Sequence, residues 1–157
     1  MAINLSKGQG VDLKKAGTPA GPFHATLRWT SAVDLDLHCF YRLADAPVKA
    51  KGFFGKIGQA LSGAGAQEGQ IYFGRKGNKA KAPWITLDKD AGVGDRGGAN
   101  EENMHFWDID KIQHALIVAN IFAKKTNFAQ YNGAVIVEGG GQKFEVPLTE
   151  TKTGSWC

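Results

Sequence analysis

Apolar side chains alternate with polar ones along much of this chain, and that period-two pattern constrains the fold more than any other feature. The alternation is clearest in residues 25–30 and 34–42, where the apolar positions are Ala25, Leu27, Trp29, Leu35, Leu37, Cys39 and Tyr41. Shorter runs rich in β-branched and aromatic residues occur at 70–73, 84–87, 134–137 and 143–148. Successive side chains of a strand point to opposite faces, so the pattern predicts half-buried strands.

Residues 112–125 form the longest apolar stretch. A helix is one reading of it, but its β-branched residues favour a central buried strand. The chain has 157 residues, 21 of them glycine, and few helical stripes. We therefore expect an all-β protein, a two-sheet β-sandwich formed by a single domain over residues 1–157.

Residues 49–66 interrupt the strand pattern. Their apolar side chains fall on one helical face: Phe53, Phe54, Ile57, Ala60 and Leu61. We expect a short helical insertion here, and its bases Lys49 and Lys56 would suit an anionic membrane surface. The alternative is a helix that caps one end of the sandwich with its apolar face.

Residues 88–102 hold five carboxylates and an asparagine among four glycines. Glycine permits tight backbone bends, and crowded carboxylates repel one another unless a cation lies between them. Ca²⁺ takes about 6–8 oxygen ligands, so a calcium-binding loop is the leading hypothesis and a solvated turn is the alternative. The direct ligands we expect are Asp90, Asp95, Glu101 and Glu102. The further candidates are Asp34, Asp36, Asp88 and Asn100.

Asp34 and Asp36 are candidates because residues two apart on a strand face the same side. They would complete the site if their strand end meets the acidic loop. The loop does not match an EF-hand, which needs glycine at its sixth position, where Val93 stands when Asp88 is the first. The glycines of residues 92–97 fit a dinucleotide fingerprint only formally, since acids rather than an apolar helix follow them.

The sequence offers no positive sign of catalysis. Its four histidines lack metal-ligand spacing, and neither a nucleophile elbow nor a phosphate-binding loop is present. A thiol reaction would need Cys39 or Cys157, and the first is expected to be buried. Basic residues 75–81 fit a solvated hairpin turn better than a nucleic-acid surface. With two cysteines, no secretory signal and no long apolar run, a cytoplasmic location is the simplest expectation.

The order of several motifs resembles the TerD family of bacterial tellurium-resistance and stress proteins, with its TerA-like branch as the candidate subgroup. Residues 5–13, LSKGQGVDL, resemble the family opening L-x-K-G-x-x-V-x-L. Residues 34–40, DLDLHCF, resemble its D-L-D-x-S-A-F strand. Asp90, Asp95 and residues 100–102 resemble its acidic loop G-D-N-x-T-G-x-G-D-G-D-D-E, and Asn127 and Phe128 stand where the family has an Asn-Phe pair between two strands.

The resemblance implies a β-sandwich that binds Ca²⁺ at one end and acts in tellurite and general stress resistance. It also implies association with other Ter-family proteins and a peripheral position at the inner membrane. Ala91 replaces a family asparagine and residues 96–99 lengthen the loop, so we expect fewer than the family's two ions. The chain stops at Cys157, where the family continues with a strand, as expected for a trimmed chain or a shorter member. The alternative function is a metal-free scaffold that docks on membrane or partner proteins through residues 49–66.

Overall fold

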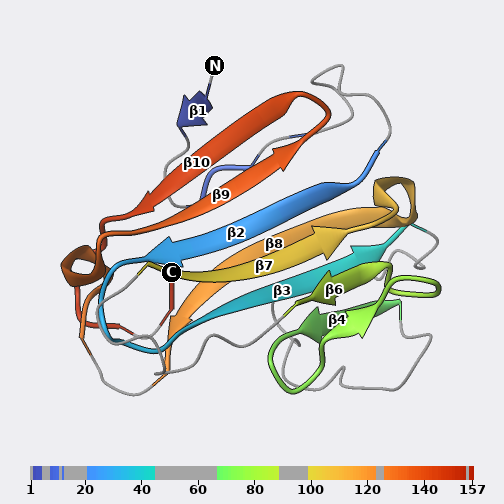
Figure 1. The fold of residues 1–157 in the computed structure, drawn as a ribbon. Helices are drawn as coiled ribbons and strands as arrows, with labels where there is room; N and C mark the ends of the chain where they lie inside the picture. Colours follow the sequence, from blue (N-terminus) through green and yellow to red (C-terminus); the bar gives the residue numbers. More distant parts are fainter. Residues whose placement is uncertain are drawn as a thin grey trace.

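The computed structural model describes residues 2–4, 8–10, 12, 21–44, 67–88, 99–122, 126–154, 156 and 157. This part of the chain forms two β-sheets, as Figure 1 shows, and the expected all-β class is confirmed. The expected helical insertion at 49–66, with Phe53, Phe54, Lys49 and Lys56, lies outside the described residues.

The larger sheet has seven strands. Their order across the sheet is β1 (Ala2–Asn4), β10 (Gln142–Leu148), β9 (Gly133–Gly139), β2 (Phe23–Trp29), β7 (Asn100–Phe106), β6 (Ile85–Leu87) and β5 (Gly77–Asn78). Neighbouring strands are antiparallel, except that β1 runs parallel to β10.

The smaller sheet has β3 (Leu35–Leu43) at its centre, between β4 (Glu68–Ile71) and β8 (Ile112–Ile121). The long apolar stretch at 112–125 therefore forms a strand rather than a helix over its described part. The expected central, buried position is wrong, because β8 lies at one end of the three-strand order and residues 113–116 are exposed. The C-terminal residues lie along the edge of β8 that faces away from β3, where Cys157 exchanges two backbone hydrogen bonds of 2.8 and 2.9 Å with Ala119.

Helical structure in the described part is limited to two 3₁₀ turns, η1 (Ile109–Lys111) and η2 (Phe128–Tyr131). Neither is long or apolar enough to cross a bilayer.

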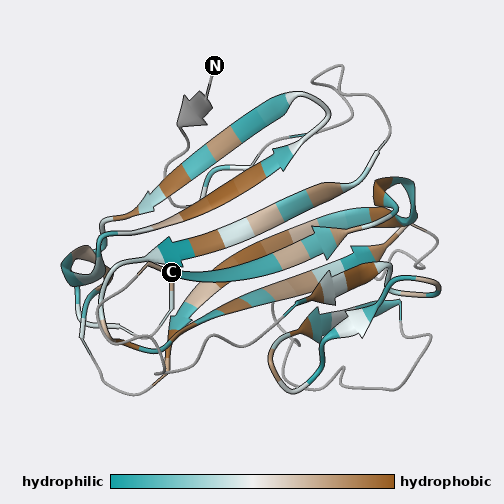
Figure 2. Ribbon diagram, in the orientation of Figure 1, coloured by the Kyte–Doolittle hydropathy of each residue, from teal (hydrophilic) through white to brown (hydrophobic). Residues whose placement is uncertain are grey.

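Residues from both sheets bury their side chains in one hydrophobic cluster. Period-two alternation explains which residues enter it, because every second side chain of β2, β3 and β7 points inward. The fully buried members on these strands include Ala25, Leu27, Leu35, Leu37, Cys39 and Met104. Figure 2 shows the resulting alternation of hydrophobic and hydrophilic residues along the strands of the larger sheet.

Candidate functional site

Strand alternation separates the two glutamates at the start of β7. Burial follows a strict inward–outward pattern along this strand, with Asn100 and Glu102 on the inner face and Glu101 on the outer face. Asn100 is 3% exposed and Glu102 is fully buried. The two glutamates therefore cannot approach one ion from the same face of the sheet.

Glu102 links the two sheets. Its Oε2 accepts a 2.7 Å hydrogen bond from the backbone N–H of Leu37 on β3. The last residue of β4 paired with β3 is Ile71, opposite Cys39, so Leu37 lies just beyond the end of β4. The carboxylate thus takes the place that a longer β4 would fill, and it satisfies a buried backbone donor.

Asp34 and Asp36 are also buried, with 9% and 3% of their surfaces exposed. Asp36 lies opposite Asn120 in the pairing of β3 with β8. The carbonyl oxygen of Asp34 accepts a 3.1 Å hydrogen bond from the N–H of Phe122, which fixes the backbone just before β3. The Oδ1 of Asp34 and the Oδ2 of Asp36 are both shielded from solvent.

Asn100 fastens the start of β7 to the bend that precedes β3. Its Nδ2 donates a 2.9 Å hydrogen bond to the carbonyl oxygen of Ser31. Together with the bond between Glu102 and Leu37, this contact holds the start of β7 against the start of β3. The backbone before and at the start of β3, which carries Asp34 and Asp36, therefore lies beside the start of β7. Because Leu35 and Leu37 point into the core, Asp34 and Asp36 point to the other face of β3. The meeting of their carboxylates with the acidic loop stays a prediction, because residues 89–98 lie outside the described part. We call Asp34, Asp36, Asn100 and Glu102 the buried acidic junction.

The described residues do not by themselves form a metal-binding group. Among them, no three His, Cys, Asp or Glu side chains come together in a way that could hold a metal ion. Two of the expected direct ligands, Asp90 and Asp95, belong to residues 89–98, outside the described part. The junction can thus supply only part of a coordination shell.

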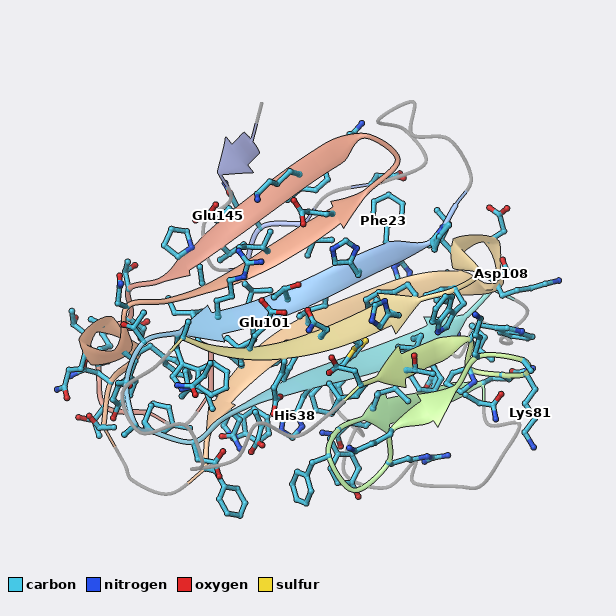
Figure 3. The ribbon with its side chains drawn as sticks, in the orientation of Figure 1. Phe23, His38, Lys81, Glu101, Asp108 and Glu145 are labelled. Atoms are coloured by element: carbon cyan, nitrogen blue, oxygen red, sulfur yellow. The ribbon has the colours of Figure 1, made fainter. Side chains whose placement is uncertain are left out.

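Asp88 and Glu101 lie on the outer face of the seven-stranded sheet, where they share Asn103. The Nδ2 of Asn103 donates to Asp88 Oδ2 at 3.0 Å and to Glu101 Oε1 at 2.9 Å. Glu101 also accepts a 3.0 Å hydrogen bond from Nε of Arg28, and Thr26 donates to Asn103 Oδ1 at 2.8 Å. We call Thr26, Arg28, Asp88, Glu101 and Asn103 the outer polar network. Figure 3 shows Glu101 on β7, away from His38 on β3 of the other sheet.

Asp88 has a second role that the sequence did not reveal. Its backbone N–H donates to the carbonyl oxygen of Asn103 at 2.9 Å, and its Oδ1 accepts from the N–H of Asn103 at 3.0 Å. These bonds close the base of the acidic segment, because Asp88 precedes residues 89–98 and Asn103 follows them on β7. Asp88 is thus placed to position the loop.

Two other titratable groups on β3 are desolvated. Burial lowers the pKa of His38 to about 4, so this imidazole is neutral at physiological pH. Burial also raises the pKa of the Cys39 thiol far above its usual value, which opposes thiolate formation. Cys39 is fully buried in the core, so it is poorly suited to a reaction with tellurite.

Comparison of the chain with family models, with curated proteins and with solved structures finds no match. The resemblance to the TerD family remains an expectation from the sequence motifs.

Proposed function

We propose that this chain is a non-enzymatic Ca²⁺-binding module whose ion lies at the buried acidic junction. The observation that supports this most directly is the burial of three carboxylates, Asp34, Asp36 and Glu102, where β3 and β7 begin. Carboxylates are rarely fully buried, and those that are usually pair with a charge or coordinate a metal.

A divalent ion would lower the electrostatic cost of this arrangement. Burial disfavours the ionised form of a carboxylate, and a hard cation beside the carboxylate reverses that effect. Carboxylate and amide oxygens are the donors that Ca²⁺ prefers. Residue 99, the first described residue after the acidic segment, leads directly into Asn100, so Asp90 and Asp95 are close in sequence to the junction.

The proposed ligand set differs from the one expected from sequence. It comprises Asp34, Asp36, Asn100 and Glu102 from the described part and Asp90 and Asp95 from the segment before Asn100. The described carboxylates do not form a metal-binding group by themselves, so the ion would have to draw them together with the acids of that segment. Asp88 and Glu101 are assigned to the outer polar network instead, because their carboxylates bond to Asn103 on the opposite face of the sheet from Glu102.

The wider biological role rests on the sequence resemblance. We infer a TerD-like two-sheet β-sandwich that acts in tellurite and general stress resistance, together with other Ter-family proteins near the inner membrane. The single hydrophobic cluster shared by both sheets supports the sandwich. A bound ion would stabilise the β3–β7 end of such a domain.

Thermal unfolding with millimolar Ca²⁺ and with chelator tests this function. An ion at a hundredfold excess over its Kd stabilises the folded state by about 2.7 kcal/mol, which corresponds to a rise in Tm of about 5–10 °C. We expect Asp36→Asn and Glu102→Gln to remove most of that rise.

Glu101→Gln is the matched control, because it removes the neighbouring carboxylate from the outer face and should leave the rise intact. Identical melting curves for the unmodified protein in Ca²⁺ and in chelator would reject the proposal. An equal loss in Glu101→Gln and Glu102→Gln would reject the assignment of ligands.

A further inference from the structure

Five rings from distant parts of the chain meet at one end of the smaller sheet. The members of this ring cluster are His38, Tyr72, Phe73, Phe122 and Trp156. Tyr72 stacks on His38 with ring centroids 5.9 Å apart, and Trp156 meets His38 edge-on at 5.0 Å. Phe73 bridges the cluster, since its ring centroid lies 5.3 Å from Tyr72 and 6.1 Å from Phe122.

The cluster is buried on one side and exposed on the other. His38 at its base is 5% exposed, whereas Phe73, Phe122 and Trp156 are 41%, 61% and 50% exposed. Single exposed aromatics are ordinary, but rings that contact one another at the surface form an apolar patch, and such patches mark interaction sites.

The backbone around these rings is fixed by hydrogen bonds. Tyr72 and Arg75 exchange two across the turn that carries Phe73, at 2.8 and 3.2 Å. Trp156 pairs with Asn120 on β8. His38 Nδ1 is 2.8 Å from Nε2 of Gln70, which holds the imidazole in place. The rings are therefore pre-organised, which lowers the entropy lost when a surface binds them.

Two basic residues, Arg75 and Lys76, lie at the end of the turn that carries Phe73 and directly after it. Lys79 does not belong to the cluster, since its Nζ lies 3.8 Å from the ring centroid of Trp107. Arg75 and Lys76 follow Phe73 within three positions, and Lys76 is exposed. Aromatic rings favour the boundary between lipid headgroups and acyl chains, while lysine and arginine are attracted to anionic headgroups.

We propose that the ring cluster, together with Arg75 and Lys76, is a docking surface for an anionic lipid bilayer. Phe73, Phe122 and Trp156 enter the headgroup region, and the two bases contact lipid phosphates and carboxylates. The surface borders the buried acidic junction, since the N–H of Phe122 donates to the carbonyl oxygen of Asp34. Docking itself requires no ion, and it involves none of residues 49–66.

Vesicle co-sedimentation of the full chain tests the proposal, with phosphatidylcholine vesicles that contain about 30% phosphatidylserine and with pure phosphatidylcholine vesicles. We expect binding to the anionic vesicles to be at least about tenfold tighter than to the neutral ones. The double variant Phe73→Ser, Phe122→Ser should weaken binding to the anionic vesicles at least about tenfold, and Lys76→Gln about threefold.

Leu116→Ser is the matched control. Leu116 is 39% exposed on β8 of the same sheet but belongs to none of the ring contacts, so its substitution should change vesicle binding less than about twofold. Each variant should keep a cooperative thermal transition, which separates lost docking from lost folding. Binding is measured in Ca²⁺ and in chelator; persistence in chelator supports docking without an ion even if the calcium proposal fails.

Several outcomes would overturn the lipid assignment. One is no sedimentation of the unmodified protein with anionic vesicles in either condition. Another is vesicle binding that the double variant retains, which would place the contact elsewhere on the chain. A dimer in light scattering that the double variant converts to monomer, without vesicle binding, would identify a second copy of the chain as the occupant.

Discussion

Two adjacent glutamates on β7 occupy opposite environments. Glu101 lies in the outer polar network, where Arg28 Nε is 3.0 Å from its carboxylate and solvent reaches both side chains. Glu102 is fully buried, and its carboxylate accepts a hydrogen bond from a backbone N–H of the other sheet. The residue type is the same, so the difference arises from the face of the strand.

The comparison shows that the position of a carboxylate determines how much it contributes to the stability of the fold. An exposed ion pair gains little because water screens it and two long side chains lose freedom. A buried carboxylate that satisfies a buried donor cannot be removed cheaply, because the donor is then left without a partner in a region of low dielectric constant. The exposed ion pair of the outer polar network should therefore add little to the free energy of unfolding, whereas the junction holds the two sheets together.

The largest effect should come from Glu102→Ala. We expect it to lower the free energy of unfolding by about 3 kcal/mol, because it opens a cavity and leaves the Leu37 N–H unsatisfied. Glu101→Ala should lower the free energy of unfolding by less than about 1 kcal/mol. Urea unfolding in chelator measures this free energy for both alanine variants, and equal decreases would contradict the contrast between the two faces of the strand. Glu102→Gln keeps the volume and an acceptor oxygen, so it should lose less than half as much as Glu102→Ala.

Asn103→Ala should lower the free energy of unfolding by an intermediate amount. The Asn103 side chain bonds to Thr26, Asp88 and Glu101, so its loss should cost about 1–2 kcal/mol even though it faces outward. Gln113→Ala on exposed β8 serves as the control and should cost less than about 0.5 kcal/mol. If both substitutions were neutral in urea unfolding, the outer polar network would be a set of independent surface contacts.

The sequence was sufficient to predict the all-β fold class. Alternation identified β2 and β3 with their inward residues, and β-branched residues distinguished β8 from a helix. These inferences succeeded because they depend on local periodicity, which the chain carries in its own order of residues. The meeting of Asp34 and Asp36 with the acidic loop stays a prediction.

Other features depend on contacts between distant segments, which periodicity does not encode. Residues 88–102 are not a single loop, because β7 begins at Asn100. Strand alternation then places Glu101 and Glu102 on opposite faces. The ring cluster was missed for the same reason, since Phe73 and Phe122 are 49 positions apart and meet only through the pairing of β3 with its neighbours. The exposed aromatic residues at the ends of strands were the one available signal.

The smallest effect concerns pH and lies on the same outer face as Glu101. The hydrogen bond from Lys143, at 3.1 Å, is the main cause that holds the pKa of Glu138 below its usual value, and His24 at 3.3 Å adds to it. A carboxylate with a lowered folded-state pKa stabilises the protein above its unfolded pKa, and that contribution disappears as pH falls through the folded value. The side chain is about one-third exposed, so we expect Glu138→Gln to cost only a few tenths of a kcal/mol at pH 7.

Urea unfolding of the two proteins is compared across pH and salt. The stability cost of Glu138→Gln should disappear as the pH falls through the lowered folded-state pKa of Glu138, and it should shrink in high salt. In a Lys143→Gln background the difference between Glu and Gln at position 138 should already be smaller at pH 7, because the main partner is gone. A cost of several kcal/mol that persists at low pH would mean that Glu138 acts through packing. The outer face would then resemble the junction, and the contrast between the two faces of the sheet would fail.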